Sequence, residues 1–231
     1  QALTMRSLGR PFAPRQLGDW YGEEFDYYAV RKKRKELMEE ALDRDGIKCK
    51  PGAVELLEDL KRLPAQIEML LSNKERIQRF ANRYVGAKDV FFIGRGIDYA
   101  ISMEGSLKLK EISYIHSEAY AAGELKHGTI SLIEEGTLVA AVATQDALFQ
   151  KTLSNMVEVK ARGAFVLAVT TEGNTEIEKA ADYVIYIPKT NAYFANSLAI
   201  IPLQLFGYYV AVGKGCDVDK PRNLAKSVTV E

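Results

Sequence analysis

The chain is poor in the side chains that build metal sites and disulfide frameworks. It has only two histidines, His116 and His127, and two cysteines, Cys49 and Cys216, among 231 residues. The cysteines stand far apart and outside any CxxC spacing, which argues against a structural metal and against a disulfide scaffold. We therefore expect a site without metal or cofactor.

The chain also lacks an excess of charge and a long apolar run. Lys and Arg number 31, as do Asp and Glu, which excludes the strongly basic surface typical of nucleic-acid binding. The amino-terminal residues lack an apolar signal core, and no uninterrupted apolar run reaches the ~18 residues of a membrane helix. The longest run, 197–213, is interrupted by Pro202 and Gln204, which indicates a buried helix. We expect a cytoplasmic protein that binds neither nucleic acid nor membrane.

The first 61 residues are polar and highly charged, with apolar side chains at helical spacing. This pattern predicts a helix that ends near Asp45, followed by amphipathic helices over 50–61 and 62–85. Beyond these helices the composition becomes apolar and alternating. Three parts are therefore expected, over residues 1–61, 62–213 and 214–231.

Four short apolar runs follow, at 89–94, 137–144, 164–170 and 182–187. Helical segments are expected between or after them, near 98–115, 146–161 and 192–213. Strands that alternate with helices predict βαβ units and a parallel sheet with helices on both faces. The fold class is therefore α/β.

The first apolar run ends in Gly94-Arg95-Gly96, directly before a predicted helix. Ligands of open parallel sheets bind beyond the carboxyl ends of strands, near helix amino termini. Glycines there allow the backbone to approach a ligand, and free N–H groups favour an anion. A plain strand-to-helix turn has the same pattern, so both interpretations stay open.

The helix after this turn places Glu104, Lys108 and Glu111 on one face, at positions i, i+4 and i+7. An exposed row of ion pairs is one interpretation. The other is a partly buried carboxylate beside an ammonium group, which is a candidate base with a tunable pKa.

The segment GELKHG, 123–128, presents His127 between two glycines. An imidazole titrates near neutral pH and suits proton transfer, although a lone histidine is more often structural. The final residues, 216–231, contain proline and apolar side chains, unlike the polar tails that usually fray. We expect this tail to dock, and a docked, desolvated lysine there could act as a Schiff-base nucleophile.

Two long stretches carry a family resemblance. MEGSLKLKEISYIHSEAYAAGELKHG (103–128) and DVDKPRNLAKSVTVE (217–231) resemble the C-terminal part of glucosamine-6-phosphate synthase, the isomerising glutamine–fructose-6-phosphate aminotransferase. The similarity runs from about residue 62 to the end of the chain. It implies a flavodoxin-like sugar-isomerase (SIS) subdomain and a homodimer.

The resemblance also implies an activity, the conversion of fructose 6-phosphate and ammonia to glucosamine 6-phosphate through a lysine Schiff base. Lys226 corresponds to the Schiff-base lysine, and Glu111 to the carboxylate that moves a proton between carbons 1 and 2. Lys108 lies beside that carboxylate, and His127 assists ring opening in the neighbouring subunit's site. Further substrate contacts are expected at Gly94, Arg95, Gly96 and Ala225.

This chain departs from the family pattern in two respects. The family begins with a glutaminase domain whose amino-terminal cysteine attacks glutamine, whereas this sequence starts with Gln1. The first SIS subdomain of the family holds most sugar-phosphate contacts in SxSGxT-like loops, and residues 1–88 contain no such loop. We therefore expect no glutamine hydrolysis, and we expect the remaining sugar-phosphate contacts to come from elsewhere.

Residues 9–61 more loosely resemble the helical cap of haloacid-dehalogenase-type phosphatases. The Asp-x-Asp nucleophile motif of that family follows a strand. The segments 43–45 and 217–219 have the same letters without a preceding strand, so phosphatase chemistry is not expected. A plain helical extension explains the front segment nearly as well.

Two functions stay open. One is the isomerase half of the synthase, with the catalytic side chains named above. The other is a non-catalytic SIS module that binds a sugar phosphate or mediates dimerisation.

Overall fold

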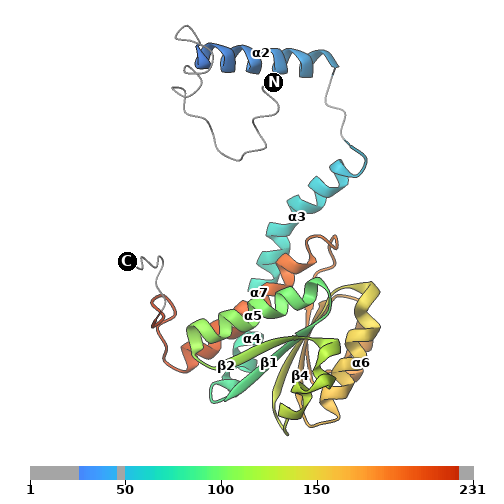
Figure 1. The fold of residues 1–231 in the computed structure, drawn as a ribbon, viewed down its shortest axis with the longest axis vertical. Coiled ribbons are helices and arrows are strands. Elements are labelled where there is room, and N and C mark those ends of the chain that lie inside the picture. Colours follow the sequence, from blue (N-terminus) through green and yellow to red (C-terminus); the bar gives the residue numbers. More distant parts are fainter. Residues whose placement is uncertain (1–25, 46–49, 224–231) are drawn as a thin grey trace. The chain divides into compact units, whose positions relative to one another are not determined.

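The computed structural model describes residues 26–45 and 50–223. The chain divides into two compact units, Gln1–Ala53 and Val54–Glu231. The second unit contains a parallel sheet and the helices that cover it (Figure 1). Every candidate site residue that the structure describes belongs to this second unit.

Helix α2 (Tyr27–Asp45) is the main described element of the first unit, and it ends at the residue expected from the sequence. Asp26 caps it, because its Oδ1 accepts a hydrogen bond from the Ala29 N–H at 2.9 Å. The apolar side chains at helical spacing in this segment include Leu37 and Met38, and these are 52% and 54% exposed. The six consecutive charged residues 31–36 cover all sides of the helix, so α2 has no continuous apolar stripe.

Helix α3 (Ala53–Ser72) continues through residues 61 and 62, where two helices were expected to meet. It ends before Asn73, and helix α4 (Lys74–Ala81) and the 3-10 turn η2 (Asn82–Tyr84) follow. The expected pair of helices, 50–61 and 62–85, is therefore corrected to this arrangement. The physical reason is one apolar stripe that repeats every three or four residues across the expected junction. Its members are Leu56, Leu60, Leu63, Ile67 and Leu70.

Five parallel strands form one sheet in the order β2-β1-β3-β4-β5. Their bounds are β1 Asp89–Gly94, β2 His116–Ala121, β3 Leu138–Ala143, β4 Phe165–Thr171 and β5 Tyr183–Ile187. The four strands expected from the sequence are confirmed, and the order is that of a flavodoxin-like sheet. Strand β2 was missed because it lies at the edge of the sheet, where its polar sequence HSEAYA need not be buried on both faces.

Helices cover both faces of the sheet (Figure 1). Helices α5 (Ile97–Ser113) and α7 (Ala195–Gly213) lie with α4 on one face, and α6 (Phe149–Lys160) lies on the other. Successive residues of β1 alternate between the two cores: Phe92 joins the cluster under α5 and α7, and Phe91 joins the cluster under α6. Short 3-10 helices complete the connections: η3 Ala122–His127, η4 Thr129–Leu132, η5 Asp146–Leu148 and η6 Thr175–Lys179.

Helix α7 is the one helix among the described residues whose length and apolar composition would also suit a membrane span. Half of its apolar window is buried inside the protein. Leu198, Leu203 and Val210 are completely buried, and Phe206 is 1% exposed. These side chains form part of the core under α5, as expected for the buried helix that the sequence indicates.

Helices α5 and α7 approach each other closely through two glycines. A Cβ atom on Gly105 of α5 would lie 2.7 Å from Cδ1 and 3.2 Å from Cβ of Leu203 on α7. A Cβ atom on Gly207 of α7 would lie 3.5 Å from the Leu109 backbone, which is an ordinary contact distance. Only Gly105 is therefore required sterically.

This difference predicts opposite effects for two matched substitutions. Gly105→Ala overpacks the interface and should lower the free energy of unfolding by about 1–2 kcal/mol, after the helix-propensity gain of alanine. Gly207→Ala has room for its methyl group and should leave the free energy of unfolding unchanged or raise it by up to about 1 kcal/mol. Urea denaturation of both variants measures the difference. Equal stabilities would contradict the packing account.

Candidate functional site

Lys108 lies between two carboxylates on α5. Its Nζ donates a hydrogen bond to Glu111 Oε2 at 2.8 Å and lies 3.4 Å from Glu104 Oε1. The side chains of Lys108 and Glu111 are 34% and 25% exposed, so the pair is half-buried. The hydrogen bond to Glu111 raises the pKa of Lys108 above its ordinary value, against the opposing effect of partial burial. The structure thus brings together the three residues selected by helical spacing.

The segment after α7 is held in place by a series of hydrogen bonds. Gly215, with φ of 72°, turns the chain out of the helix. Oδ1 of Asp217 then accepts hydrogen bonds from the N–H groups of Asp219 and Lys220, each at 3.0 Å. This is an Asx-type turn, so Asp217 has a structural role and, as expected, no preceding strand.

The same segment docks on the carboxyl end of α5. The backbone N–H of Arg222 donates to the hydroxyl of Tyr114 at 2.8 Å. The guanidinium of Arg222 lies 4.1 Å from the centre of the Tyr114 ring, in cation–π geometry. Tyr114 caps α5 in a left-handed conformation, with φ of 61°. The tail therefore reaches the end of the helix that carries Glu111. Ala225 and Lys226 lie outside the described residues.

His127 and Glu111 lie at opposite ends of the parallel strands. His127 ends η3, which follows the carboxyl end of β2, whereas Glu111 is close to the amino end of that strand. The six residues of β2 separate the two ends of the strand by about 20 Å at ~3.3 Å per residue. The imidazole of His127 is 64% exposed, with Glu124 Oε2 at 4.0 Å from its Nε2. The fold of one chain does not bring His127 to the Lys108–Glu111 pair.

The Gly94-Arg95-Gly96 turn is shaped by its own backbone. A Cβ on Gly94 would lie 2.5 Å from the Asp98 carbonyl group, and Gly96 has φ of 57° and ψ of −128°. The Arg95 carbonyl accepts a hydrogen bond from Gln145 Nε2 at 2.7 Å. Both glycines are thus explained by the tight turn, and ligand contact there stays a prediction.

The side chain of Arg95 joins three segments. Its Nε donates to Asn155 Oδ1 on α6 at 3.0 Å. Its guanidinium also lies against Gly123, where an added Cβ would be 2.6 Å from Nη2. The first glycine of the GELKHG segment therefore makes room for Arg95. Arg95 therefore packs beside the loop that carries His127.

Asp98 ties the first strand-to-helix turn to the loop after β3. This carboxylate is 1% exposed and accepts hydrogen bonds from the N–H and hydroxyl of Thr144, at 2.8 and 2.6 Å. Removing it would leave a buried N–H without its acceptor, at a cost of about 1–3 kcal/mol. Asp98 was not predicted from the sequence, although an acidic side chain in the first helical turn after a glycine turn was a usable signal.

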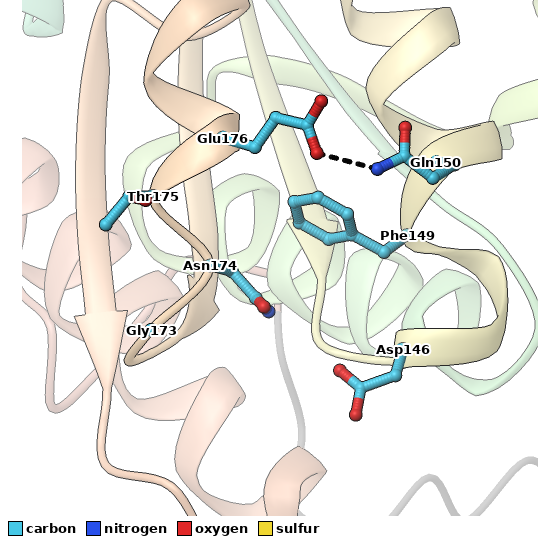
Figure 2. A pocket seen from close by; sticks show the side chains of 7 residues that line it. All are labelled: Asp146, Phe149, Gln150, Gly173, Asn174, Thr175 and Glu176. Carbon is cyan, nitrogen blue, oxygen red and sulfur yellow. Dashed lines mark hydrogen bonds between the residues drawn. The ribbon is translucent and has the colours of Figure 1, made fainter.

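A pocket of about 350 Å³ opens at the carboxyl ends of β3 and β4. Figure 2 shows the side chains that line it, with the Gln150 amide donating to Glu176 Oε2 at 2.7 Å. The lining residues are Asp146, Phe149, Gln150, Gly173, Asn174, Thr175 and Glu176. The sequence analysis selected none of them.

The chemistry of this pocket disfavours a phosphate group. Asp146 and Glu176 bring two carboxylates to its wall, and these repel an anion. The amide groups and the Phe149 ring suit an uncharged polar ligand better. Glu111 lies near the amino ends of the strands, so the pocket is separate from the Lys108–Glu111 pair. In residues 26–45 and 50–223, no group of three or more His, Cys, Asp or Glu side chains is placed to hold a metal ion.

Tyr114 and Arg222, which join the tail to α5, were also not predicted from the sequence. Both lie inside the two stretches that carry the family resemblance, 103–128 and 217–231. Their pairing across more than a hundred residues of sequence depends on the packing of α5 against α7, which no local pattern reveals.

Comparison with known proteins identifies close relatives. The SIS domain family matches residues 83–213. The isomerizing glutamine–fructose-6-phosphate aminotransferase of Caldanaerobacter subterraneus subsp. tengcongensis is 61% identical over 188 residues, covering 81% of this chain and 31% of that protein. The same enzyme of Methanosarcina acetivorans is 52% identical over 173 residues, covering 75% of this chain and 28% of that protein.

A solved structure gives the same result. The C-terminal domain of glucosamine-fructose-6-phosphate aminotransferase from Francisella tularensis superposes with a TM-score of 0.68 and 38% identity, covering 72% of this chain and 47% of that one. The resemblance stated from the sequence and the flavodoxin-like α/β fold are both confirmed. The chain spans about a third of the length of its curated relatives. The aligned part is 81% of this chain, about 187 residues, whereas 62–231 holds 170, so the similarity begins before residue 62 and before helix α3.

The two carboxylates around Lys108 predict unequal effects on its pKa. Glu111→Gln removes the 2.8 Å charged hydrogen bond and should lower the pKa of Lys108. Glu104→Gln, the matched control, removes a 3.4 Å contact and should lower it less. Because the folded pKa is raised, the stabilisation from this pair is present below the ordinary lysine pKa and is lost as the pH rises through the folded value. NMR titration of the lysine Nζ measures both variants, and a larger effect of Glu104→Gln would contradict the geometry.

Proposed function

The chain belongs to the SIS domain family, and we propose that it is the sugar-isomerase half of a glutamine–fructose-6-phosphate aminotransferase. In this proposal residues 62–213 form the second SIS subdomain with α3 leading into it, and 214–231 form a catalytic tail. One observation carries the proposal: the tail docks on Tyr114, at the end of the helix that holds the half-buried Lys108–Glu111 pair. The ligand is a sugar phosphate, fructose 6-phosphate or glucosamine 6-phosphate.

Lys226 is the proposed nucleophile. Its neutral amine attacks carbon 2 of the open-chain ketose, and water leaves as the Schiff base forms. Asn223 is the last described residue, and three further residues extend at most about 10 Å, which is within reach of the α5 end. Ammonia then displaces the lysine amine from carbon 2. Ala225, next to Lys226, would contact the substrate at the same place.

Glu111 is the proposed proton carrier. A carboxylate takes a proton from carbon 1 and returns it to carbon 2, while the hydroxyl proton on carbon 1 passes to the imine nitrogen; the ketose imine thereby becomes the 2-amino aldose. Lys108 donates a hydrogen bond to this carboxylate at 2.8 Å and so fixes its orientation. Partial burial of the pair strengthens this interaction relative to a fully exposed one.

His127 is proposed to serve the site of a second subunit. Its exposure and its place at the opposite edge of the sheet support a role outside its own chain, in ring opening by proton transfer. We infer a homodimer on this basis, and a cytoplasmic location, as expected from the sequence, remains part of the proposal. The Gly94-Arg95-Gly96 turn, which Asn155 and Gln145 hold in place, would lie at that same edge.

A non-catalytic sugar-phosphate or dimerisation module is the second candidate. The pair of carboxylates makes the described pocket unsuited to a phosphate, which favours the dimerisation form of this candidate over sugar-phosphate binding at that pocket. A Schiff-base lysine has no purpose in such a module. Covalent trapping therefore separates the two functions.

The test is reduction of the chain with borohydride in the presence of fructose 6-phosphate, followed by peptide mass spectrometry. We expect one hexose-phosphate adduct, on Lys226, and its loss in Lys226→Arg. Glu111→Gln should still form the adduct, because imine formation precedes proton transfer, but should abolish conversion to glucosamine 6-phosphate in an active assembly. Labelling of Lys226 at the level of other lysines would favour the non-catalytic module.

A further inference from the structure

Tyr114 and Arg222 make two separate contacts with each other. The tyrosine hydroxyl accepts the Arg222 backbone N–H at 2.8 Å, and the tyrosine ring receives the Arg222 guanidinium at 4.1 Å. The two contacts use different atoms of each residue. They can therefore be removed one at a time.

The segment that leads to Arg222 has little freedom elsewhere. Cys216 N–H donates to the Ala211 carbonyl at 3.0 Å, and Asp217 holds the next turn through two N–H groups. Pro221 restricts the backbone directly before Arg222. Among the described residues of the tail beyond this turn, Arg222 makes the hydrogen bond that ties it to α5.

The contact between Tyr114 and Arg222 lies at the end of α5, close in sequence to Glu111. Tyr114 follows Glu111 by three residues, about one helical turn. Its left-handed backbone, with φ of 61°, ends the helix and is unusual for a tyrosine, so the ring is set by the helix cap. An anchor at this position limits how far the following residues can move from Glu111.

We propose that Tyr114 and Arg222 form a clamp that holds the tail at the end of α5, and that this clamp speeds the reaction proposed for Lys226 and Glu111. Both are positioning residues, acting through the tail. This inference rests on the proposed function for its catalytic part, whereas the anchoring itself stands on the described contacts. The clamp reduces the motion of a lysine whose amine must meet carbon 2 of the sugar beside the carboxylate.

Two variants separate the two contacts. Tyr114→Phe removes the hydroxyl acceptor and keeps the ring, and Arg222→Ala removes the guanidinium and keeps the backbone N–H. Arg222→Lys retains a cation for the ring and should recover part of the effect. The matched controls are Lys220→Ala, an exposed cation of the same segment, and Tyr208→Phe, an exposed tyrosine of α7.

The first measurement is hydrogen–deuterium exchange of the substrate-free full chain. Tyr114→Phe should speed exchange of the Arg222 amide by about two- to tenfold, since that N–H loses its acceptor. The controls should leave the exchange rate unchanged. An unchanged rate in Tyr114→Phe would overturn the clamp, whatever the chain does with sugar.

The second measurement is the rate of borohydride trapping of fructose 6-phosphate at Lys226, at saturating sugar and at equal folded concentration. Tyr114→Phe and Arg222→Ala should each slow trapping about two- to tenfold, with Arg222→Lys between Arg222→Ala and the unmodified chain. A purely structural role would lower stability without changing this rate. Unchanged trapping would overturn the positioning role and leave the proposed function standing. No adduct in the unmodified chain would overturn the proposed function and the positioning role together, with amide exchange still deciding the anchor.

Discussion

The close approach of α5 and α7 is the constraint on which the arrangement of the site depends. Gly105 lets Leu203 of α7 enter the surface of α5, and the two helices then cover the same face of the sheet. Because α7 runs alongside α5, the segment after α7 emerges beside the carboxyl end of α5. The contact between Arg222 and Tyr114 exists only as a result of this helix pairing.

The contacts at the carboxyl ends of the strands differ from those at the amino ends. At the carboxyl ends of the strands, Asp98, Thr144 and Gln145 bind one another and the first turn, so that region is tied together by the protein's own groups. At the amino ends of the strands, the Lys108–Glu111 pair is half-buried, and the tail docks on Tyr114 of the same helix. An open parallel sheet ordinarily binds ligands at its carboxyl edge. The proposed chemistry of this chain lies at the amino ends of the strands, as expected for a domain that completes a site built partly by other segments.

The distance between His127 and Glu111 also affects how copies of the chain could form a shared site. About 20 Å of strand separates His127 from Glu111, and neither η3 nor the end of α5 can shift by that amount within a packed core. A shared site therefore needs a second copy if both residues act on one sugar. Arg95 packs beside Gly123 of the His127 loop and donates a hydrogen bond to Asn155, so it lies between that loop and α6.

Much of this protein follows from local sequence. Strand and helix alternation established the α/β fold, since buried strands need continuous apolar runs, and helical spacing established that Lys108 meets Glu104 and Glu111. Edge strand β2 and the continuous helix α3 were not foreseen. In the first case the hydrogen bonds to β1 stabilise a polar strand, and in the second an apolar stripe joins two segments.

Other features were decided by the tertiary structure alone. The separation of His127 from Glu111, the buried Asp98 link and the Tyr114–Arg222 contact all join residues far apart in the chain. Sequence patterns report the environment of neighbouring residues, because helix and strand periods are local. Which distant residues meet is set by the packing of whole helices against the sheet, and that depends on the summed shape of many side chains.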